Sequence, residues 1–479
     1  MTPPATIPSP TESTTSDTAT SAKSLATPEH GAAGRASPAR TSPATPGFLQ
    51  NVARRVVLQR LASLAVGSLE IHEAWGDEPM VLRGRLGMTE DGLGDASRLP
   101  PAPHAVLRVS DPRFYGELLS RGSLGAAESY LDGAWTSDDL VALVRLLVRN
   151  RDVLDAMEGG LARLVTPVRA LWSLARRNTK DGSRRNISAH YDLGNDFFEL
   201  FLDDTLTYSS GVFEHPNATL REASVAKLDR LCRKLDLHPE HHLLEIGTGW
   251  GSMAMHAAAT YGCRVTTTTI SREQHDLATT RIARAGLSDR VTVLLEDYRD
   301  LRGSYDRIVS VEMVEAVGRR YLPTYLESCS RLLARDGLFA MQAIHILDKD
   351  FERAAREVDF IKRYVFPGSF IPSVTALCDA MAAKTDMRLV QLEDMTPHYA
   401  RTLAEWRGSL HTNTERILAT GRDTPFLRLW DYYLAYCEGG FRERFIGVSQ
   451  LLMAKPLNRR DPILPPRETL GGLPAHAAR

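Results

Sequence analysis

Short apolar runs alternate with segments of helical periodicity through the second half of the chain. Helical patterns include Glu273–Ala285 and Tyr321–Leu332. Runs typical of buried strands occur at Leu243–Ile246, Arg264–Thr268, Val291–Leu295, Arg307–Val311 and Leu338–Gln342, with later β-like runs at Arg388–Leu392 and Phe445–Met453. This alternation predicts an α/β fold with a mostly parallel, doubly wound sheet covered by helices on both faces.

The first half of the chain predicts a smaller α+β domain over residues 47–150. A strand-like run, Ala105–Val109, precedes helical patterns at Phe114–Arg121 and Leu124–Tyr130. A further helical segment, Leu140–Arg149, is apolar on most of its surface and is interrupted by two arginines one turn apart.

Composition defines the remaining segments. Residues 1–46 are rich in Ala, Pro, Ser and Thr and predict a disordered tail, and residues 461–479 predict a flexible one. Residues 151–185 predict a basic helical linker before the α/β domain of residues 186–460. The linker either rests on anionic lipid headgroups or packs on a neighbouring domain, and the sequence favours neither.

Bulk properties exclude several classes of protein. The 479 residues are 43% hydrophobic and 24% charged, with a formal net charge of −1. This balance is ordinary for a globular protein and gives no nucleic-acid signature. The five cysteines form no Cys-x-x-Cys pair, so we expect neither a disulfide framework nor a metal site. Without a secretory signal or an apolar run of ~20 residues, we expect a cytoplasmic protein whose membrane contact is peripheral.

A glycine turn is the first candidate for chemistry. In HLLEIGTGWG (242–251) an apolar run carries Glu245 and breaks into Gly247, Gly249 and Gly251, and a helical segment follows. Glycines permit positive φ and a close ligand approach. The spacing differs from that of pyrophosphate binders and no positive side chain lies nearby. A phosphate is therefore not the obvious ligand. The turn is similar to that of enzymes that place S-adenosylmethionine across it, which implies an adenosyl group with an amino-acid tail, and a turn that serves only the fold is the alternative.

Segments on both sides of this turn are more specific. They are SLGAAESYLDGAW (123–135), NISAHYDLGNDFFELFLDDTLTYSSGVF (186–213), TTISREQ (268–274), EDYRDL (296–301), VSVEMVEAVG (309–318), YVFPG (364–368) and YYLAYCEGGF (432–441). Together they resemble the cyclopropane fatty-acid synthase family of S-adenosylmethionine-dependent lipid methyltransferases, from about Phe114 to Pro456. The resemblance implies a class I methyltransferase sheet with one antiparallel strand and a helical lid, and S-adenosylmethionine as cofactor.

The resemblance also assigns the cofactor site. The matching positions are Glu245, Gly247, Gly249 and Gly251 for the methionine part, Thr269 and Gln274 for the ribose, Asp297 and Tyr298 for the adenine, and Tyr208 and Ser209 for a lid that closes over the cofactor. The run of threonines around Thr269 is also what a β-branched strand requires.

The family's reaction defines the catalytic positions. Methyl transfer to an isolated alkene leaves a carbocation, which the enzyme must shield from water and deprotonate. Aromatic faces stabilise a cation by ~0.5–2 kcal/mol each, and fixed dipoles and carboxylates add more. In the family a bound bicarbonate serves as proton acceptor. The resemblance assigns this site to Glu315, Tyr433, Gln342, Ser210, the amide of Ile344, and Cys437.

Two of these positions depart from the family pattern. Ser210 stands where a cysteine is common, and Gln342 where a histidine is common. Both side chains can still donate hydrogen bonds, but Gln342 cannot become cationic. Cys437 has no base to activate it, so packing is favoured over covalent catalysis. Glu312 is a second carboxylate, and Glu315 is preferred because it matches the family position.

The sequence therefore predicts methyl transfer from S-adenosylmethionine to a cis double bond in the acyl chains of membrane phospholipids. The expected product is a cyclopropane fatty acid formed through a carbocation. Methyl- or methylene-branched products are the nearest alternative, because Ser210 and Gln342 depart from the pattern. A small-molecule methyltransferase and a non-catalytic lipid-binding protein are more distant ones. We expect peripheral association with the inner face of the membrane, and by analogy with the family a homodimer.

Overall fold

The computed structural model describes residues 45–85, 101–158, 182–183 and 194–460. The tails predicted at residues 1–46 and 461–479 lie almost wholly outside the described residues. So does most of the predicted linker, whose first part forms the helix α4, Arg151–Glu158. Residues 186–193, which begin the segment quoted above as NISAHYDLGNDFFELFLDDTLTYSSGVF, also lie outside them.

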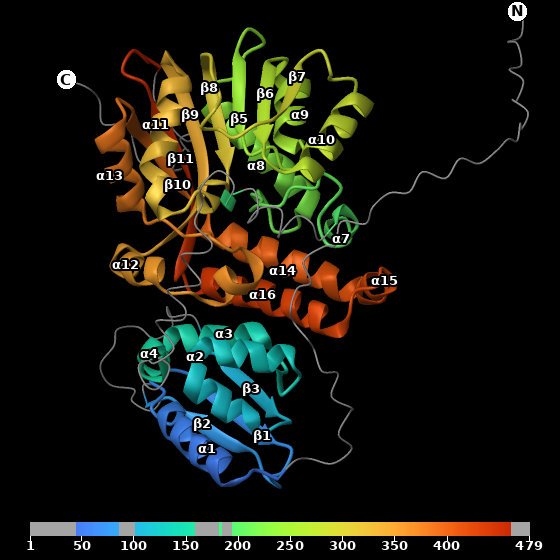
Figure 1. Ribbon diagram of the computed structural model, residues 1–479, viewed down its shortest axis with the longest axis vertical. Coiled ribbons are helices and arrows are strands. Elements are labelled where there is room, and N and C mark those ends of the chain that lie inside the picture. The colour runs from blue at the N-terminus through green and yellow to red at the C-terminus, as the bar shows by residue number, and fades with distance from the viewer. Residues whose placement is uncertain (1–44, 86–100, 159–181, 184–193, 461–479) are drawn as a thin grey trace, which may run out of the picture. The chain divides into compact units, whose positions relative to one another are not determined.

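A seven-stranded sheet forms the larger domain, with strand order β10-β11-β9-β8-β5-β6-β7 (Figure 1). Strand β11 is antiparallel to both of its neighbours, and the remaining pairs are parallel. The strands are β5 (His242–Ile246), β6 (Arg264–Thr269), β7 (Val291–Leu295), β8 (Tyr305–Val311), β9 (Leu333–Ile346), β10 (Arg388–Asp394) and β11 (Ile446–Ala454). The predicted doubly wound sheet with one antiparallel strand is thus confirmed.

Helices cover the sheet and one of its ends. They are α7 (Asn195–Phe198), α8 (Leu220–Lys234), α9 (Ser252–Tyr261), α10 (Arg272–Arg284), α11 (Leu322–Leu332), α12 (Asp348–Arg356), α13 (Val374–Lys384), α14 (Thr396–Thr412), α15 (Thr414–Ala419) and α16 (Thr424–Arg442). Helix α8 begins with a capping box in which Thr219 and Glu222 satisfy each other's backbone amides. Figure 1 shows α14 and α16 side by side, next to the ends of the strands where β8 and β9 finish.

Strand β9 is longer than its apolar pattern predicts. It runs through polar residues at its start and on to Ile346, because β11 pairs with it from Leu338 to Ile346. This extension carries Ile344 beyond the end of β8 at Val311. An apolar run alone underestimates a strand whose ends are held by a neighbour.

The smaller domain is α+β, as predicted. Its four-stranded sheet has the order β2-β1-β3-β4. Its elements are α1 (Phe48–Leu61), β1 (Ser68–Glu73), β2 (Met80–Arg83), β3 (His104–Val109), α2 (Arg113–Leu131), β4 (Trp135–Ser137) and α3 (Leu140–Arg149). The two helical patterns predicted here form α2, which breaks at Gly122 with φ 62° and ψ −143°.

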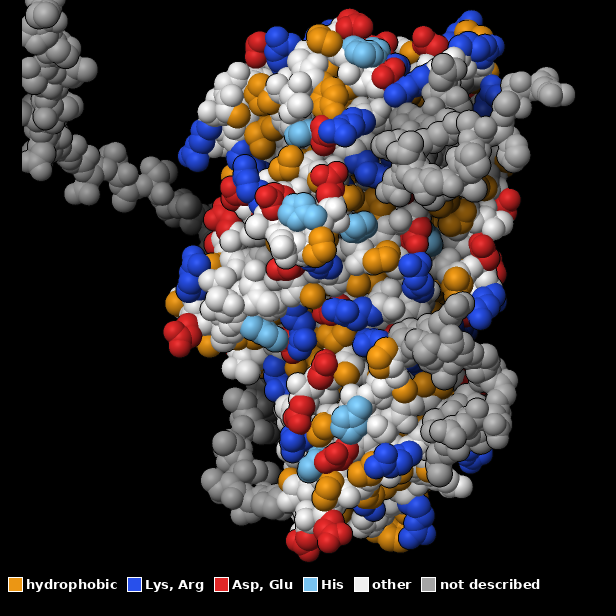
Figure 2. Space-filling model, turned by 180° about the vertical axis from the view of Figure 1, so that it is seen from behind, with side chains coloured by type: hydrophobic (Ala, Val, Ile, Leu, Met, Phe, Trp, Pro, Cys, Tyr) orange, Lys and Arg blue, Asp and Glu red, His pale blue; other side chains and the backbone are white. Residues whose placement is uncertain are grey.

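The contacts of helix α3 account for its mixture of apolar residues and two arginines. Most of its apolar residues are buried. Its two arginines, Arg145 and Arg149, each donate at 2.6 Å to the carboxylate of Glu443, just after α16. No helix among the described ranges is long and apolar enough to cross a bilayer. On the face shown in Figure 2, acidic and basic side chains are interspersed, in keeping with the near-zero net charge.

Candidate active site

A cavity of about 490 Å³ lies at the carboxyl ends of the parallel strands, where ligands bind in open α/β sheets. Most of the predicted site residues line it, namely Tyr208, Ser209, Glu245, Gly247, Gly249, Thr269, Gln274, Asp297, Tyr298, Glu315, Ile344, Tyr433 and Cys437. Three others, Gly251, Ser210 and Gln342, lie behind its wall. The ligand and catalytic roles of all of them remain predictions.

The glycine turn follows β5 and approaches the cavity with its backbone. Gly247 has φ 102°, and a Cβ there would lie 3.0 Å from the side chain of Met313. Gly249 has φ 51° and would meet nothing within 4 Å, so its backbone is open to a ligand. Gly251 caps α9, and its missing Cβ instead makes room for Ala278, 3.3 Å away. This third glycine therefore serves helix packing rather than the cavity.

Glu245, at the end of β5, carries an unsatisfied carboxylate oxygen in the cavity wall. Its side chain is buried, and among the described residues Oε2 has no hydrogen-bond partner. Burial raises the pKa of this carboxyl to about 8. A buried orphan acceptor calls for a donor from a ligand. The ammonium of an amino-acid tail fits this requirement, so the residues present suit S-adenosylmethionine at the glycine turn.

Lys227 is a buried ammonium that the sequence analysis did not single out. It comes from α8, lines the cavity, and donates to Oγ of Ser209 at 2.7 Å. Burial lowers its pKa to about 8, while the nearby carboxylates of Glu312 and Glu245 oppose that shift. The sequence could have indicated that Lys227 is buried, because it lies on the apolar face of α8 between Ala223 and Leu231.

The adenine and ribose positions are already held in place by protein contacts. Arg299 donates to both carboxylate oxygens of Asp297, at 2.8 and 2.6 Å, and so fixes its orientation. The Thr269 hydroxyl donates to Oε1 of Gln274 at 2.8 Å, which leaves the amide nitrogen of Gln274 as a donor for a ligand. Arg299 was also missed from the sequence, although it follows Asp297 by two residues.

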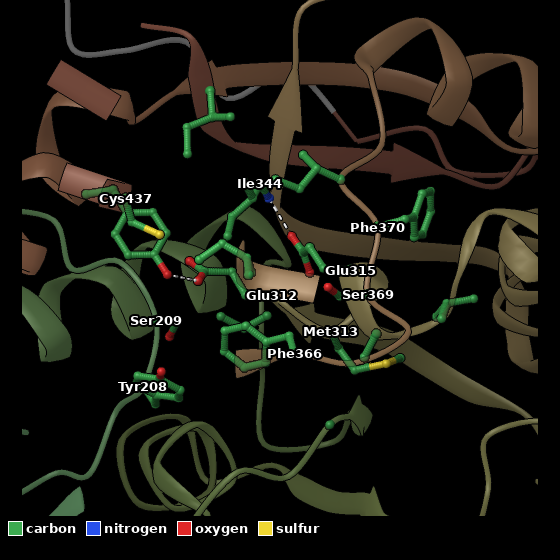
Figure 3. A pocket seen from close by; sticks show the side chains of 18 of the residues that line it. Tyr208, Ser209, Glu312, Met313, Glu315, Ile344, Phe366, Ser369, Phe370 and Cys437 are labelled. Atoms are coloured by element: carbon green, nitrogen blue, oxygen red, sulfur yellow. Dashed lines mark hydrogen bonds between the residues drawn. The ribbon is translucent and has the colours of Figure 1, made fainter. Parts of the chain in front are cut away.

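Two carboxylates, Glu312 and Glu315, lie close together after β8 (Figure 3). Oε1 of Glu315 accepts from the backbone amide of Ile344 at 2.5 Å. Its Oε2 is buried without a hydrogen-bond partner among the described residues. Burial, and then the charge of Glu312, raise the pKa of Glu315 to about 8. The cavity thus presents a carboxyl group whose second oxygen is left for a substrate.

Ser210 and Gln342 are fully buried behind Glu312 rather than exposed to the cavity. The amide nitrogen of Gln342 donates to Glu312 at 2.8 Å and to the carbonyl of Ser210 at 3.2 Å. The Ser210 hydroxyl donates to the carbonyl of Gly211 at 3.1 Å. The side chains of Ser210 and Gln342, both predicted to contact a bound anion, therefore donate their hydrogen bonds to other groups of the protein.

Aromatic rings form much of the remaining wall. The hydroxyls of Tyr208 and Tyr433 lie 3.1 Å apart, which joins the predicted lid to α16. Phe366, from the segment YVFPG, packs edge-on against Tyr433 with ring centroids 5.9 Å apart. Cys437 lies one turn after Tyr433, and burial raises the pKa of its thiol. A protonated thiol is a poor nucleophile, so Cys437 serves as a wall residue in this geometry.

A model of the family described as mycolic acid cyclopropane synthetase matches residues 178–451. The chain belongs to this family. The chain is similar to tuberculostearic acid methyltransferase UfaA1 of Mycobacterium tuberculosis, with 37% identity over 369 residues that cover 75% of this chain and 85% of that protein. Cyclopropane-fatty-acyl-phospholipid synthase of Escherichia coli strain K12 is 34% identical over 368 residues, or 73% of this chain and 88% of that one.

A solved structure of mycolic acid cyclopropane synthase CmaA1, complexed with SAH and CTAB, is similar in fold and sequence. It superimposes with a TM-score of 0.54 and 33% identity over 57% of this chain and 98% of that one. Membership in the mycolic acid cyclopropane synthetase family makes the chain an S-adenosylmethionine-dependent methyltransferase of the cyclopropane synthase type. The predicted family, fold, enzyme class and methyl donor are thereby confirmed.

Proposed function

We propose that this enzyme adds one carbon from S-adenosylmethionine to the cis double bond of an unsaturated acyl chain in a membrane phospholipid. The proposal rests mainly on the cavity, whose lining combines aromatic rings with Glu315, and Oε2 of Glu315 has no hydrogen-bond partner among the described residues. An isolated alkene offers a protein nothing to hydrogen-bond. Apolar walls with one buried carboxyl group suit an alkene that becomes a cation.

The cavity also has room for a chain. Besides Glu315, its lining includes Tyr436 and Phe441 of α16 and Val144 and Val148 of α3. The rings of Tyr436 and Phe441 and the methyl groups of the two valines offer the apolar contact that a fatty acyl tail requires. A phospholipid tail reaching this cavity from a bilayer would place the enzyme on the membrane surface during turnover.

The protein has a different role in each step of the proposed reaction. When bound, S-adenosylmethionine supplies an electrophilic methyl group. The alkene's π electrons form the new carbon–carbon bond as the carbon–sulfur bond breaks toward sulfur, leaving a positive carbon in the chain. The rings of Tyr208, Phe366 and Tyr433 and the carboxyl pair Glu312 and Glu315 surround that charge and exclude water. Loss of a proton then closes a ring.

The product of the expected ring closure is a cyclopropane fatty acid. A methyl- or methylene-branched fatty acid is the second candidate. It is favoured by Ser210 and Gln342, which depart from the family pattern, and by the similarity to a protein named tuberculostearic acid methyltransferase. If a hydride first shifts from the methyl-bearing carbon to the positive carbon, loss of a proton from the added methyl leaves a methylene branch. Reduction of that double bond by an external hydride donor and a proton then gives a methyl branch.

Label transfer tests the reaction. We expect the purified enzyme, given unsaturated phospholipid vesicles and methyl-labelled S-adenosylmethionine, to place the label in the acyl chain. NMR of the recovered chains then separates ring protons from exocyclic methylene protons. Vesicles of saturated phospholipid are the matched control and should acquire no label. Label in a headgroup, or none in either vesicle, contradicts the proposal.

Turnover should also depend on pH through Glu315. The pKa of this carboxyl is raised to about 8, so below that pH the group is mostly protonated and cannot act as an anion. We expect kcat at saturating cofactor to rise with pH along a limb with its midpoint near 8. The limb should be absent in Glu315→Gln, and its persistence there would assign it to another group.

A further inference from the structure

The carboxylate of Glu312 has an unusually complete set of donors for a side chain in a cavity wall. Its Oε1 accepts from the backbone amide of Ser210 at 2.9 Å and from the Gln342 amide at 2.8 Å. Its Oε2 accepts from the hydroxyl of Tyr399, on α14, at 2.6 Å. Three donors from three separate parts of the chain thus converge on one carboxylate, which lies beside Glu315 in Figure 3.

The backbone at Glu312 is held in an unfavourable conformation. It follows β8 directly with φ 49°, a region that side chains other than glycine seldom adopt. The conformation is fixed by the Glu312 amide, which donates to the carbonyl of Gln342 at 2.8 Å. Strain of this kind persists where the surrounding structure demands it and is concentrated at functional sites.

A free bicarbonate ion does not fit the residues that the family resemblance assigns to it. The Ile344 amide is bonded to Glu315, the Gln342 amide to Glu312, and the Ser210 hydroxyl to Gly211. The remaining donor, the hydroxyl of Tyr433, lies 3.1 Å from that of Tyr208. An extra anion would also lie beside the two buried carboxyl groups of Glu312 and Glu315, and a second negative charge close to an ionised carboxylate is strongly unfavourable there.

We infer that Glu312 is the enzyme's built-in anion, taking with its own side chain the place of a bound bicarbonate. The inference rests on the proposed function and assigns one of its catalytic groups. The carboxylate lines the cavity beside Glu315, so it contacts the space where the positive carbon forms. When a C–H bond of the added methyl breaks, its electrons form the bond to the positive carbon that closes the ring, or, after a hydride shift, the methylene double bond. The proton passes to the Glu312–Glu315 pair.

Two substitutions separate the charge of Glu312 from its volume. Glu312→Gly removes the carboxylate, suits the positive φ, and leaves a space lined by the donors of Ser210, Gln342 and Tyr399. Glu312→Gln fills the same space, keeps acceptor capacity and removes only the charge. Glu327→Gln, on the exposed surface of α11, is the matched control for loss of one carboxylate.

The experiment measures label transfer in carbon-dioxide-free buffer with and without added bicarbonate or formate. We expect the wild type and Glu327→Gln to be unaffected by the anions, and both Glu312 variants to be slower by about 100-fold. Added anion should restore much of the rate of Glu312→Gly and none of that of Glu312→Gln. Binding of S-adenosylhomocysteine at wild-type affinity shows that each variant is folded.

Three results would overturn the assignment. They are a wild-type rate that collapses without bicarbonate, a Glu312→Gln variant at wild-type rate, and a slow Glu312→Gly variant that neither anion restores. If the wild type labels no acyl chain under any condition, the proposed function itself fails. Label transfer that requires bicarbonate contradicts only the role of Glu312.

Discussion

Replacement of Glu315 by glutamine is expected to lower kcat by about 1000-fold, within the range typical for loss of a positioned acid or base. The amide keeps the acceptor for the Ile344 backbone, which lies 2.5 Å from Oε1, so the local fold should persist. It replaces the unpaired Oε2 by a neutral group, and the positive carbon then loses its nearest free anionic oxygen. The rate of label transfer to vesicles at saturating cofactor measures the effect.

The same variant should bind S-adenosylhomocysteine almost as the wild type does. Glu315 follows β8, whereas Glu245 lies in β5 and the glycine turn follows that strand, so the proposed site for the tail of the cofactor is elsewhere. Glu327→Gln, which removes an exposed carboxylate from α11, should retain full turnover. Full activity of Glu315→Gln would remove this residue from the mechanism, and a parallel loss of cofactor binding would assign it to folding or binding instead.

The architecture of the larger domain was predictable from the sequence, because the spacing of apolar residues and the length of each apolar run distinguish its strands from its helices. Each central strand is buried on both faces and therefore reads as an apolar run, as in Leu243–Ile246 and Arg307–Val311. The helices α14 and α16 were less visible in the sequence. They bury mixed aromatic and polar residues such as Thr402 and Tyr432, so their apolar stripe is interrupted.

The polar connections within the site were beyond prediction, because they join residues far apart in the chain. Ser210, Gln342 and Tyr399 come from three distant segments and meet only on Glu312. The sequence showed two carboxylates in VSVEMVEAVG and gave no means of knowing that Glu312 is saturated by donors while Glu315 is not. It also identified Ser210 and Gln342 as departures, but their effect became clear only when both proved to support Glu312 from behind.

Replacement of Glu245 by glutamine should weaken the binding of S-adenosylhomocysteine by about 300-fold, since loss of one partner of a buried charge pair costs ~2–5 kcal/mol. The carboxylate is buried at the end of β5, and its Oε2 has no partner among the described residues. We expect the ligand's ammonium to supply that partner. Isothermal titration calorimetry on wild type, Glu245→Gln and Glu327→Gln measures the change.

A ligand without the amino-acid tail makes this prediction specific. 5′-Methylthioadenosine keeps the adenine, ribose and sulfur and has no ammonium, so Glu245→Gln should bind it as the wild type does. Weakening of both ligands would mean that the substitution disturbs the glycine turn as a whole. Undiminished affinity for S-adenosylhomocysteine would show that Glu245 does not contact the tail. Burial raises the pKa of Glu245 to about 8. We therefore expect the ligand's positive charge to keep this carboxyl ionised at neutral pH, and the difference in affinity between the two ligands measures that coupling.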